Sequence, residues 1–159
     1  MSELARKAEI HELVLRYWRE VDERWGAEAH NFFTPDGVFA SESNRLVGRG
    51  EIKAFYDWRR GRGERVARHI VNNALVSLDG ADRATVSYIM TIFAADGVPV
   101  LPVRSPNLIS DVSERLVRVD GVWMIEEKAF STLFKGEVAA TVMPADVLAA
   151  TRAAAKAAG

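Results

Sequence analysis

The chain has 159 residues, the length of one ordinary domain, which is enough to bury roughly two-thirds of the surface that the unfolded form exposes. It contains no cysteine, which excludes disulfides, thiolate nucleophiles and zinc or iron–sulfur sites built on cysteine. Its 21 Lys and Arg residues balance 22 Asp and Glu residues, and the charges are interspersed, so no footprint for nucleic acid or an anionic membrane is indicated.

The first predicted element is an amphipathic helix from Glu3 to about Trp25, with Gly26 as its stop. Its apolar residues recur at three- and four-residue steps: Ile10, Leu13, Val14, Tyr17, Trp18, Val21 and Trp25. The following run, HNFFTPDGVFASES, predicts a short helix or turn that feeds a strand, and a second strand at 44–47 closes the hairpin. A second helix is predicted at 51–60.

Beyond residue 64 the hydrophobic period changes to two, which predicts four long strands. They span 65–78, 83–94, 108–119 and 122–134. Helices that precede a meander of antiparallel strands are typical of an α+β fold. The alanine-rich tail predicts a helix with few large apolar residues to dock it, so either a lid or a frayed end is expected. We therefore expect a single domain over residues 1–136 and a tail over residues 137–159.

The N-terminal segment contains no continuous apolar run as long as a signal peptide or a membrane span. We expect a cytoplasmic protein that neither enters a membrane nor binds nucleic acid, and whose partner is a small molecule.

Asp22 is unusual because it falls in the last turn of an otherwise apolar helix. At 100° per residue it lies within about 60° of Leu15, Trp18 and Trp25. Apolar neighbours and the negative end of the helix dipole both disfavour a carboxylate, so Asp22 needs a partner. One alternative is that the Asp22 carboxylate pairs with a nearby arginine or reaches solvent.

His69 is the second unusual residue, because it lies on an apolar face of a predicted strand. Side-chain alternation places it with Ala67, Val71, Asn73 and Leu75. A lone strand histidine is commonly a satisfied core residue. However, Asp22 and His69 each need a partner, and each suits the other. Such a pair fixes the imidazole tautomer and stabilises the imidazolium that forms when the ring takes a proton, as a general base requires.

Other chemistries find less support in the sequence. His11 and His30 are expected at the surface, and no spacing of histidines or carboxylates typical of a metal site occurs. No Gly-x-Ser-x-Gly elbow is present for a serine nucleophile. No cofactor or metal is therefore expected. The aromatic residues are concentrated in the helical half, where they form a core or line a pocket for a flat apolar ligand.

Several strings, in their order, resemble the nuclear transport factor 2-like superfamily and, more narrowly, its SnoaL-like branch. They are the long first helix, FFTPDGVF, GRGEIKAFYDW, ARHIVNN and LVRVDGVWMI, and they cover residues 8–136. The resemblance implies a cone-shaped α+β fold in which a curved antiparallel sheet wraps around the N-terminal helices and leaves a deep apolar pocket. It also implies a homotrimer or homodimer built through the outer face of the sheet.

The resemblance extends to site residues. In lyases of the lindane dehydrochlorinase, scytalone dehydratase and bile acid dehydratase types, an Asp late in the first helix and a His early in the third strand form the catalytic pair. Asp22 and His69 match those positions, which implies that His69 is the general base and that Asp22 orients it. Tyr17 matches a site tyrosine of the bile acid dehydratase type, so it is either an acid or a core residue. No His or Asp stands at 87–91, where the dehydratases place a further acid or base, so that constellation is incomplete.

The orientation of Lys128 is open. Strict alternation from Trp123 points Glu127 inward and Lys128 outward, whereas a single bulge turns Lys128, Phe130 and Thr132 inward. Dehydrochlorinase-like members hold a cation near this position, which implies contact with a leaving anion; an outer-face salt bridge is the alternative. The residues expected to contact substrate are Trp18, Trp25, Phe33, Asn73 and Lys128.

The sequence thus predicts a cofactor-independent lyase that eliminates water, halide or a carbon fragment such as an aldehyde from a small aromatic or alicyclic substrate. An isomerase or cyclase needs the same base. A non-catalytic ligand-binding module, like the small subunit of ring-hydroxylating dioxygenases, is the alternative from another class. The Asp22–His69 pair discriminates, because an assembly subunit has no reason to place these two residues together in an apolar pocket.

Overall fold

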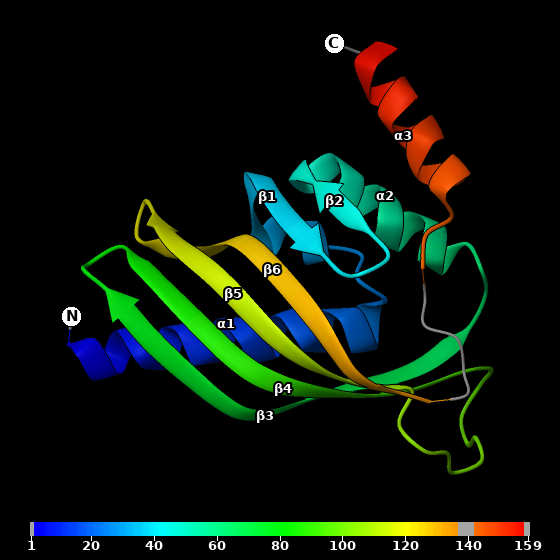
Figure 1. Ribbon diagram of the computed structural model, residues 1–159, viewed down its shortest axis with the longest axis horizontal. Coiled ribbons are helices and arrows are strands. Elements are labelled where there is room, and N and C mark those ends of the chain that lie inside the picture. Colours follow the sequence, from blue (N-terminus) through cyan, green and yellow to red (C-terminus); the bar gives the residue numbers. More distant parts are fainter. Residues whose placement is uncertain (1, 137–141, 158–159) are drawn as a thin grey trace.

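The computed structural model describes residues 2–136 and 142–157, with an α+β architecture (Figure 1). The helical elements are α1 (Glu3–Arg24), the short 3-10 helix η1 (Ala29–Phe32), α2 (Gly48–Arg60) and α3 (Ala145–Ala157). The strands are β1 (Phe33–Ala40), β2 (Arg45–Val47), β3 (Arg65–Asp79), β4 (Arg83–Asp96), β5 (Leu108–Val119) and β6 (Val122–Lys135). The predicted order of elements is confirmed, and the four long strands begin at the predicted residues.

The six strands form one sheet in the order β2-β1-β6-β5-β4-β3. The pair β1–β6 is parallel and the other pairs are antiparallel, so the sheet is mixed rather than wholly antiparallel. The sheet curves around α1 without closing, and β2 and β3 are its edges (Figure 1). The expected α+β class is confirmed, with α1 lying along the concave side of the sheet (Figure 1).

Helix α1 forms and ends where its sequence dictates. The Ser2 hydroxyl accepts a hydrogen bond from the Ala5 backbone N–H at 3.2 Å and caps the first turn. Trp25 adopts a left-handed conformation at φ 54° and Gly26 follows at φ 73°, which ends the helix. The side chains one to two turns apart, such as Ile10, Val14 and Tyr17, are buried against the sheet.

Two irregularities reverse which face a strand turns inward. In β3 the register shifts between Asn72 and Leu75, and Asn73 takes φ 53°. Beyond this bulge Ala74 and Val76 pack on the core, while Asn73 and Leu75 are exposed. The prediction that Asn73 shares the inner face with His69 is therefore wrong, because alternation does not continue across the bulge.

The second irregularity lies in β6. Leu116 pairs with Ile125 but Arg115 pairs with Glu127, so Glu126 is an extra residue in β6. The bulge turns Lys128 inward together with Phe130 and Thr132, which share its face of β6, and Lys128 is completely buried. Of the two orientations left open by the sequence, the inward one is observed.

The C-terminal segment from residue 142 packs against the body of the protein. Asn44 exchanges two hydrogen bonds with the Met143 backbone, at 3.1 and 2.9 Å. The Arg152 guanidinium contacts the Glu51 carboxylate at 2.8 Å and joins α3 to α2. The described part of the tail is thus a docked helix. Its expected action as a lid stays a prediction, and residues 137–141 of the expected tail lie outside the described residues.

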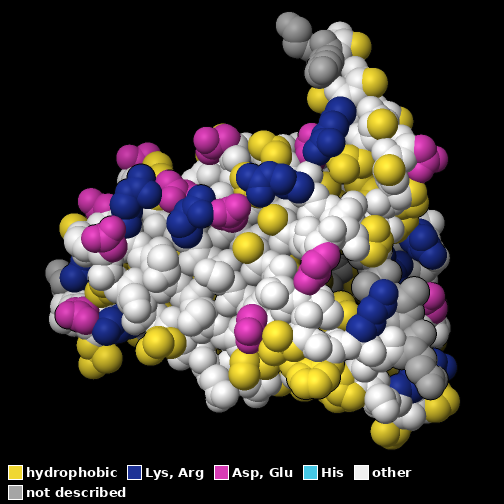
Figure 2. Space-filling model, in the orientation of Figure 1, with side chains coloured by type: hydrophobic (Ala, Val, Ile, Leu, Met, Phe, Trp, Pro, Cys, Tyr) yellow, Lys and Arg dark blue, Asp and Glu magenta, His cyan; other side chains and the backbone are white. Residues whose placement is uncertain are grey.

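The face of the molecule shown in Figure 2 carries basic and acidic side chains close together. On the strands, Arg83 contacts Glu126 at 3.0 Å, and Glu127 pairs with both Arg45 and Arg115. Over residues 2–136 and 142–157, no helix is long and apolar enough to cross a membrane. Assembly as a trimer or dimer stays a prediction.

Candidate active site

The sheet brings Asp22 and His69 together. Asp22 Oδ1 lies 2.6 Å from His69 Nδ1, and Asp22 Oδ2 accepts a hydrogen bond of 2.9 Å from the His69 backbone N–H. Strand β3 is an edge, so this backbone group faces α1 rather than another strand. One carboxylate therefore binds both the backbone and the side chain of the same histidine and fixes the ring relative to the strand.

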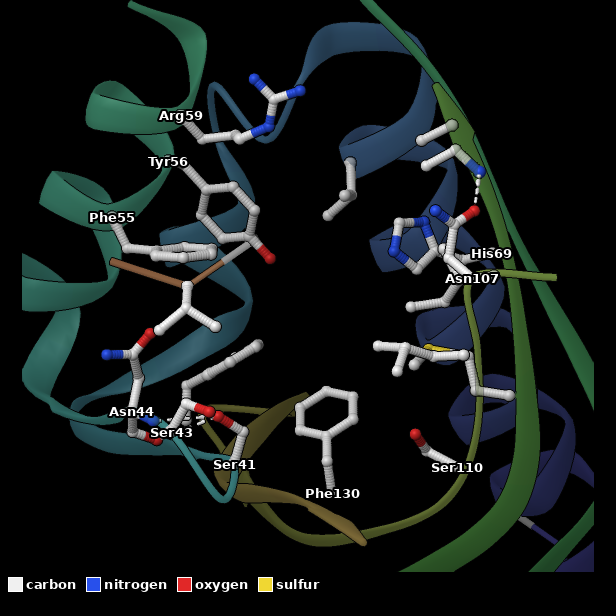
Figure 3. Close-up of a pocket in the computed structure, with 18 of the residues that line it drawn as sticks. Ser41, Ser43, Asn44, Phe55, Tyr56, Arg59, His69, Asn107, Ser110 and Phe130 are labelled. Atoms are coloured by element: carbon white, nitrogen blue, oxygen red, sulfur yellow. Dashed lines mark hydrogen bonds between the residues drawn. The ribbon is translucent and has the colours of Figure 1, made fainter. Parts of the chain in front are cut away.

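This arrangement sets the tautomer of neutral His69. The carboxylate has no proton to donate, so Nδ1 carries the proton and donates it to Asp22. The Nε2 atom is then a bare acceptor, and it makes no hydrogen bond within the described part of the chain. Both side chains are largely shielded, with 13% of His69 and 9% of Asp22 exposed. Figure 3 shows the imidazole projecting into a cavity, across from Tyr56.

Trp18 holds the imidazole from the side. Its indole stacks on the ring of His69, with centroids 4.3 Å apart and planes 13° from parallel. The indole N–H donates to the Tyr88 hydroxyl at 2.9 Å, and that hydroxyl donates to Glu114 at 2.6 Å. Asp22 therefore restrains the imidazole in its plane and Trp18 restrains it perpendicular to the plane.

Glu114 and Lys128 form a fully buried ion pair behind Trp18. Lys128 Nζ lies 2.5 Å from Glu114 Oε1 and 3.8 Å from the centroid of the Tyr17 ring. Burial lowers the pKa of Lys128, and the nearby Glu114 charge opposes that shift. Although Lys128 points inward, it does not line the cavity, so direct contact with a leaving anion, one of the expectations for it, is not observed.

The cavity has a volume of about 750 Å³ and lies between α2 and the concave face of the sheet. Apolar and aromatic side chains form most of its wall, among them Trp18, Trp25, Phe39, Phe55, Ile92 and Phe130. This volume and lining suit a small organic molecule. His69, Trp18 and Trp25, all expected at the site, line this cavity.

Two further expected site residues lie behind the wall. Phe33 is completely buried and belongs to the core, because β1 starts at this residue and turns its ring under α1. Tyr17 is also completely buried, and its hydroxyl lies 2.6 Å from that of Tyr56. Tyr56 lines the cavity, so Tyr17 reaches the site only through its neighbour. Burial raises the pKa of both hydroxyls, which keeps them protonated.

Tyr56 belongs to the aromatic residues of the helical half that were expected to form a core or line a pocket, whereas the polar cavity residues Asn107 and Arg59 were not predicted from the sequence. The Asn107 amide oxygen accepts a 2.6 Å hydrogen bond from the Ala94 backbone N–H, which fixes the orientation of the amide. The amide nitrogen is buried and has no partner among the described residues, and the residue as a whole is 4% exposed. Asn107 therefore lines the cavity with its amide held by β4 and with one buried donor that has no partner in the described part of the chain (Figure 3).

The other two histidines stand apart from the site. His11 is exposed on α1, as expected, and His30 is half-buried in η1. Within residues 2–136 and 142–157, no three His, Cys, Asp or Glu side chains gather closely enough to hold a metal ion.

A curved, open sheet wrapped around a helix, with a cavity on its concave side, defines the nuclear transport factor 2-like, or cystatin-like, class of α+β proteins. The SnoaL-like domain family matches residues 2–129, and the chain belongs to this family. No functionally curated protein matches the sequence.

Solved structures share the fold at low sequence identity. A function-unknown protein of Mycobacterium tuberculosis is 24% identical with a TM-score of 0.71, over 99% of this chain and 98% of that chain. A scytalone dehydratase-like protein of Novosphingobium aromaticivorans is 18% identical with a TM-score of 0.73, over 89% and 95%. A protein with a cystatin-like fold from Nostoc punctiforme is 19% identical with a TM-score of 0.69, over 84% and 94%. At these identities the likeness shows the fold alone.

Proposed function

We propose that the protein is a cofactor-independent lyase in which His69 is the general base. One observation carries the proposal: Asp22 holds the Nδ1–H of His69, and the bare Nε2 belongs to a ring that projects into a cavity of about 750 Å³. A base held in one tautomer beside an apolar binding space is what proton abstraction from a bound organic molecule requires. The substrate class is a small aromatic or alicyclic compound with a leaving group.

In the proposed reaction, Nε2 removes a proton from a carbon atom of the substrate. The electrons of the broken C–H bond form a C=C bond, and the bond from the neighbouring carbon to the leaving group breaks. Asp22 stabilises the imidazolium by its charge and its hydrogen bond. If the proton is taken from a hydroxyl instead, the O–H electrons form the carbonyl of the departing fragment, such as an aldehyde, as the adjacent C–C bond breaks. The electrons of that bond stay on the other carbon, which takes the proton back from the His69 imidazolium.

The leaving group needs a proton or a hydrogen bond as it departs. The raised pKa of Tyr56 makes its phenol a poor proton donor, so we assign it a hydrogen bond to the leaving oxygen, supported from behind by Tyr17. The imidazolium of His69 then returns the abstracted proton to that oxygen, on the same face of the substrate. This route needs no second acid and accommodates the absence of His or Asp at positions 87–91.

An isomerase or cyclase would use the same base and return the proton to carbon. A non-catalytic binding module would use the cavity but not the pair. Because a carboxylate clamped on a histidine serves no binding purpose in an apolar wall, we favour catalysis.

Incubation with a panel of small aromatic and alicyclic alcohols and halides in D₂O tests the proposal, with products followed by mass spectrometry. We expect an elimination product for at least one compound, and His69→Gln should lower the rate by about 10²-fold or more. Asp22→Asn should cause a similar loss. The Asn oxygen would accept from the His69 backbone N–H, leaving its NH₂ to face Nδ1, so the ring proton would move to Nε2.

His11→Gln is the matched control, because His11 lies exposed on the helix that carries Asp22. It should keep the wild-type rate. Near-native turnover by His69→Gln would refute the role of the base. Deuterium incorporated into recovered or rearranged substrate, without elimination, would favour the isomerase. No turnover and no exchange with any compound would favour the binding module.

A further inference from the structure

One end of the cavity is lined by cations. Arg59 and Arg60 come from the last turn of α2, and Arg65 comes from the start of β3. A further lining cation, Lys135 at the end of β6, lies in the cross-strand row of His69, through Ile92 and Leu108. Among the described lining residues, Glu42 is the carboxylate that accompanies them, and it accepts hydrogen bonds from the Thr132 backbone N–H and hydroxyl. This excess of positive charge stands out in a chain whose net charge is −1.

Arg59 and Arg65 share a single carboxylate. Asp96 Oδ1 lies 3.3 Å from Arg59 Nη2 and 3.1 Å from Arg65 Nη1. Asp96 is 74% exposed, whereas Arg59 is 12% exposed and its guanidinium reaches over the end of the cavity (Figure 3). Burial and the neighbouring Arg65 lower the pKa of Arg59. The pair of arginines is therefore short of negative charge on its cavity side.

Arg60 adds a buried donor. Its Nη2 contacts Asp57, whereas its Nη1 is buried without a hydrogen-bond partner among the described residues. The helix dipole favours cations in the last turn of α2 and accounts for two arginines there. It does not account for Arg65, which comes from β3 and meets Arg59 at the Asp96 carboxylate.

The cationic end lies at a defined distance from the base. Arg65, Ala67 and His69 alternate along one face of β3 and all line the cavity. At about 3.3 Å per residue, the Cα atoms of Arg65 and His69 are roughly 13 Å apart. A ligand that contacts both ends therefore has an apolar body about the length of one or two rings, with different polar groups at its ends.

We propose that the substrate of this protein is a carboxylic acid. Its carboxylate binds Arg59 and Arg65 at the cationic end, its apolar body lies against the aromatic wall, and its reacting carbon lies at His69. Arg59 and Arg65 are substrate-binding residues, since planar guanidinium groups suit a carboxylate. This inference deepens the proposed lyase function and takes the position of the reacting carbon from it, but the preference for an acid rests on the arginines alone.

Equilibrium binding of two probes tests the inference without any turnover. The probes are 2-naphthoate and its neutral isostere 2-naphthamide, titrated calorimetrically into the full chain at low salt. We expect naphthoate to bind at least about tenfold more tightly than naphthamide, because a charge-assisted contact is roughly twice as strong as a neutral one. Arg59→Gln and Arg65→Gln should each weaken naphthoate binding about five- to tenfold and leave naphthamide binding unchanged.

Arg59→Lys should retain part of the preference for the acid, since it keeps the charge but not the planar guanidinium. Arg19→Gln is the matched control, because Arg19 lies exposed on α1, paired with Glu23 and outside the cavity, and it should bind both probes like the wild type. Equal affinity for the two probes, an equal loss for both in Arg59→Gln, or no binding of either probe at millimolar concentration would each overturn the proposal.

His69→Gln separates this inference from the lyase function. The variant should lose turnover but keep the preference for naphthoate. A preference for naphthoate in a protein that eliminates nothing would leave the acid-binding site standing and refute the lyase. Turnover of neutral substrates without any preference for naphthoate would support the lyase and refute the acid-binding site.

Discussion

The buried ion pair between Lys128 and Glu114 gives a sharp prediction about stability. Both side chains are completely buried, with Nζ 2.5 Å from Oε1, so water screens neither charge. Lys128→Met would leave the Glu114 carboxylate with the Tyr88 hydroxyl as its remaining donor. Removal of one partner from a buried pair costs about 3–5 kcal/mol because an uncompensated charge stays in the interior. A domain of this size has roughly 5–15 kcal/mol to lose, so the variant should fold but unfold at much lower urea concentration.

Removing both charges should cost much less. In Glu114→Gln combined with Lys128→Met, the glutamine oxygen still accepts from the Tyr88 hydroxyl, and methionine fills the space of the lysine stem. We expect the double variant to be at least about 2 kcal/mol more stable than the sum of the two single losses predicts. Urea unfolding followed by tryptophan fluorescence, at pH 7 and with equal m-values, measures all three changes.

Lys7→Met is the matched control, because Lys7 pairs with Glu3 at 2.8 Å on the exposed face of α1. It should cost less than about 0.5 kcal/mol. A loss below about 1 kcal/mol in Lys128→Met would show that Glu114 is already neutral in the folded protein. Strict additivity of the two single losses would show that the charges are not coupled. Either result refutes the reasoning.

Two further predictions concern the backbone at the cavity and the docking of α3. A Cβ at Gly26 would lie 2.2 Å from the Tyr56 ring, so Gly26→Ala should displace that ring. The control is Gly63→Ala, where the added Cβ meets nothing within 4 Å and only the positive φ is strained. We expect Gly26→Ala to lower the melting temperature by several degrees more than Gly63→Ala does. Hydrogen bonding and charge from Arg152 lower the pKa of Glu51 from its ordinary value of 4.5, so this pair stabilises the fold above about pH 4.5, and its contribution is lost as the pH falls through the lowered pKa. The difference in urea stability between wild type and Arg152→Gln should therefore be a few tenths of a kcal/mol at pH 7, as expected for a partly exposed pair, and vanish on acidification. Equal losses of stability in Gly26→Ala and Gly63→Ala would contradict the first prediction. A stability difference for Arg152→Gln that grows in acid would contradict the second.

The secondary structure followed closely from the sequence because its signals are local. Apolar residues at helical spacing, a two-residue period and the turns at 79–80 and 120–121 each depend on neighbouring residues alone. The pairing of Asp22 with His69 could be predicted from the sequence for a different reason. Each group stood in surroundings that disfavour an unpartnered polar side chain, and the fold that the residues resemble places those positions opposite each other.

The remaining parts of the site depend on single extra residues and on loop geometry. The bulge at Asn73 moved that residue to the outside, and the extra residue Glu126 turned Lys128 inward; alternation cannot reveal either shift. Asn107 was missed because it precedes β5 at the end of an irregular segment, and its amide is oriented by a backbone N–H of another strand. Arg59 was missed because a cation in the last turn of a helix has an ordinary explanation in the helix dipole.

The buried polar groups of the sheet support the ring of His69 indirectly. Neither Glu114 nor Lys128 lines the cavity in the described part of the chain, yet Glu114 accepts from Tyr88, and Tyr88 accepts from the indole N–H of Trp18. The indole in turn lies flat on His69, where its negative ring face favours a cation. The lysine that the sequence offered as a partner for a leaving anion is instead committed to Glu114 and to the rings around it. In the proposed elimination, the positive charge available beside the leaving group is therefore the imidazolium that His69 forms when it removes the proton. The proposed mechanism therefore assigns both roles, base and proton donor, to one residue that Asp22 holds by hydrogen bonds and Trp18 covers by stacking.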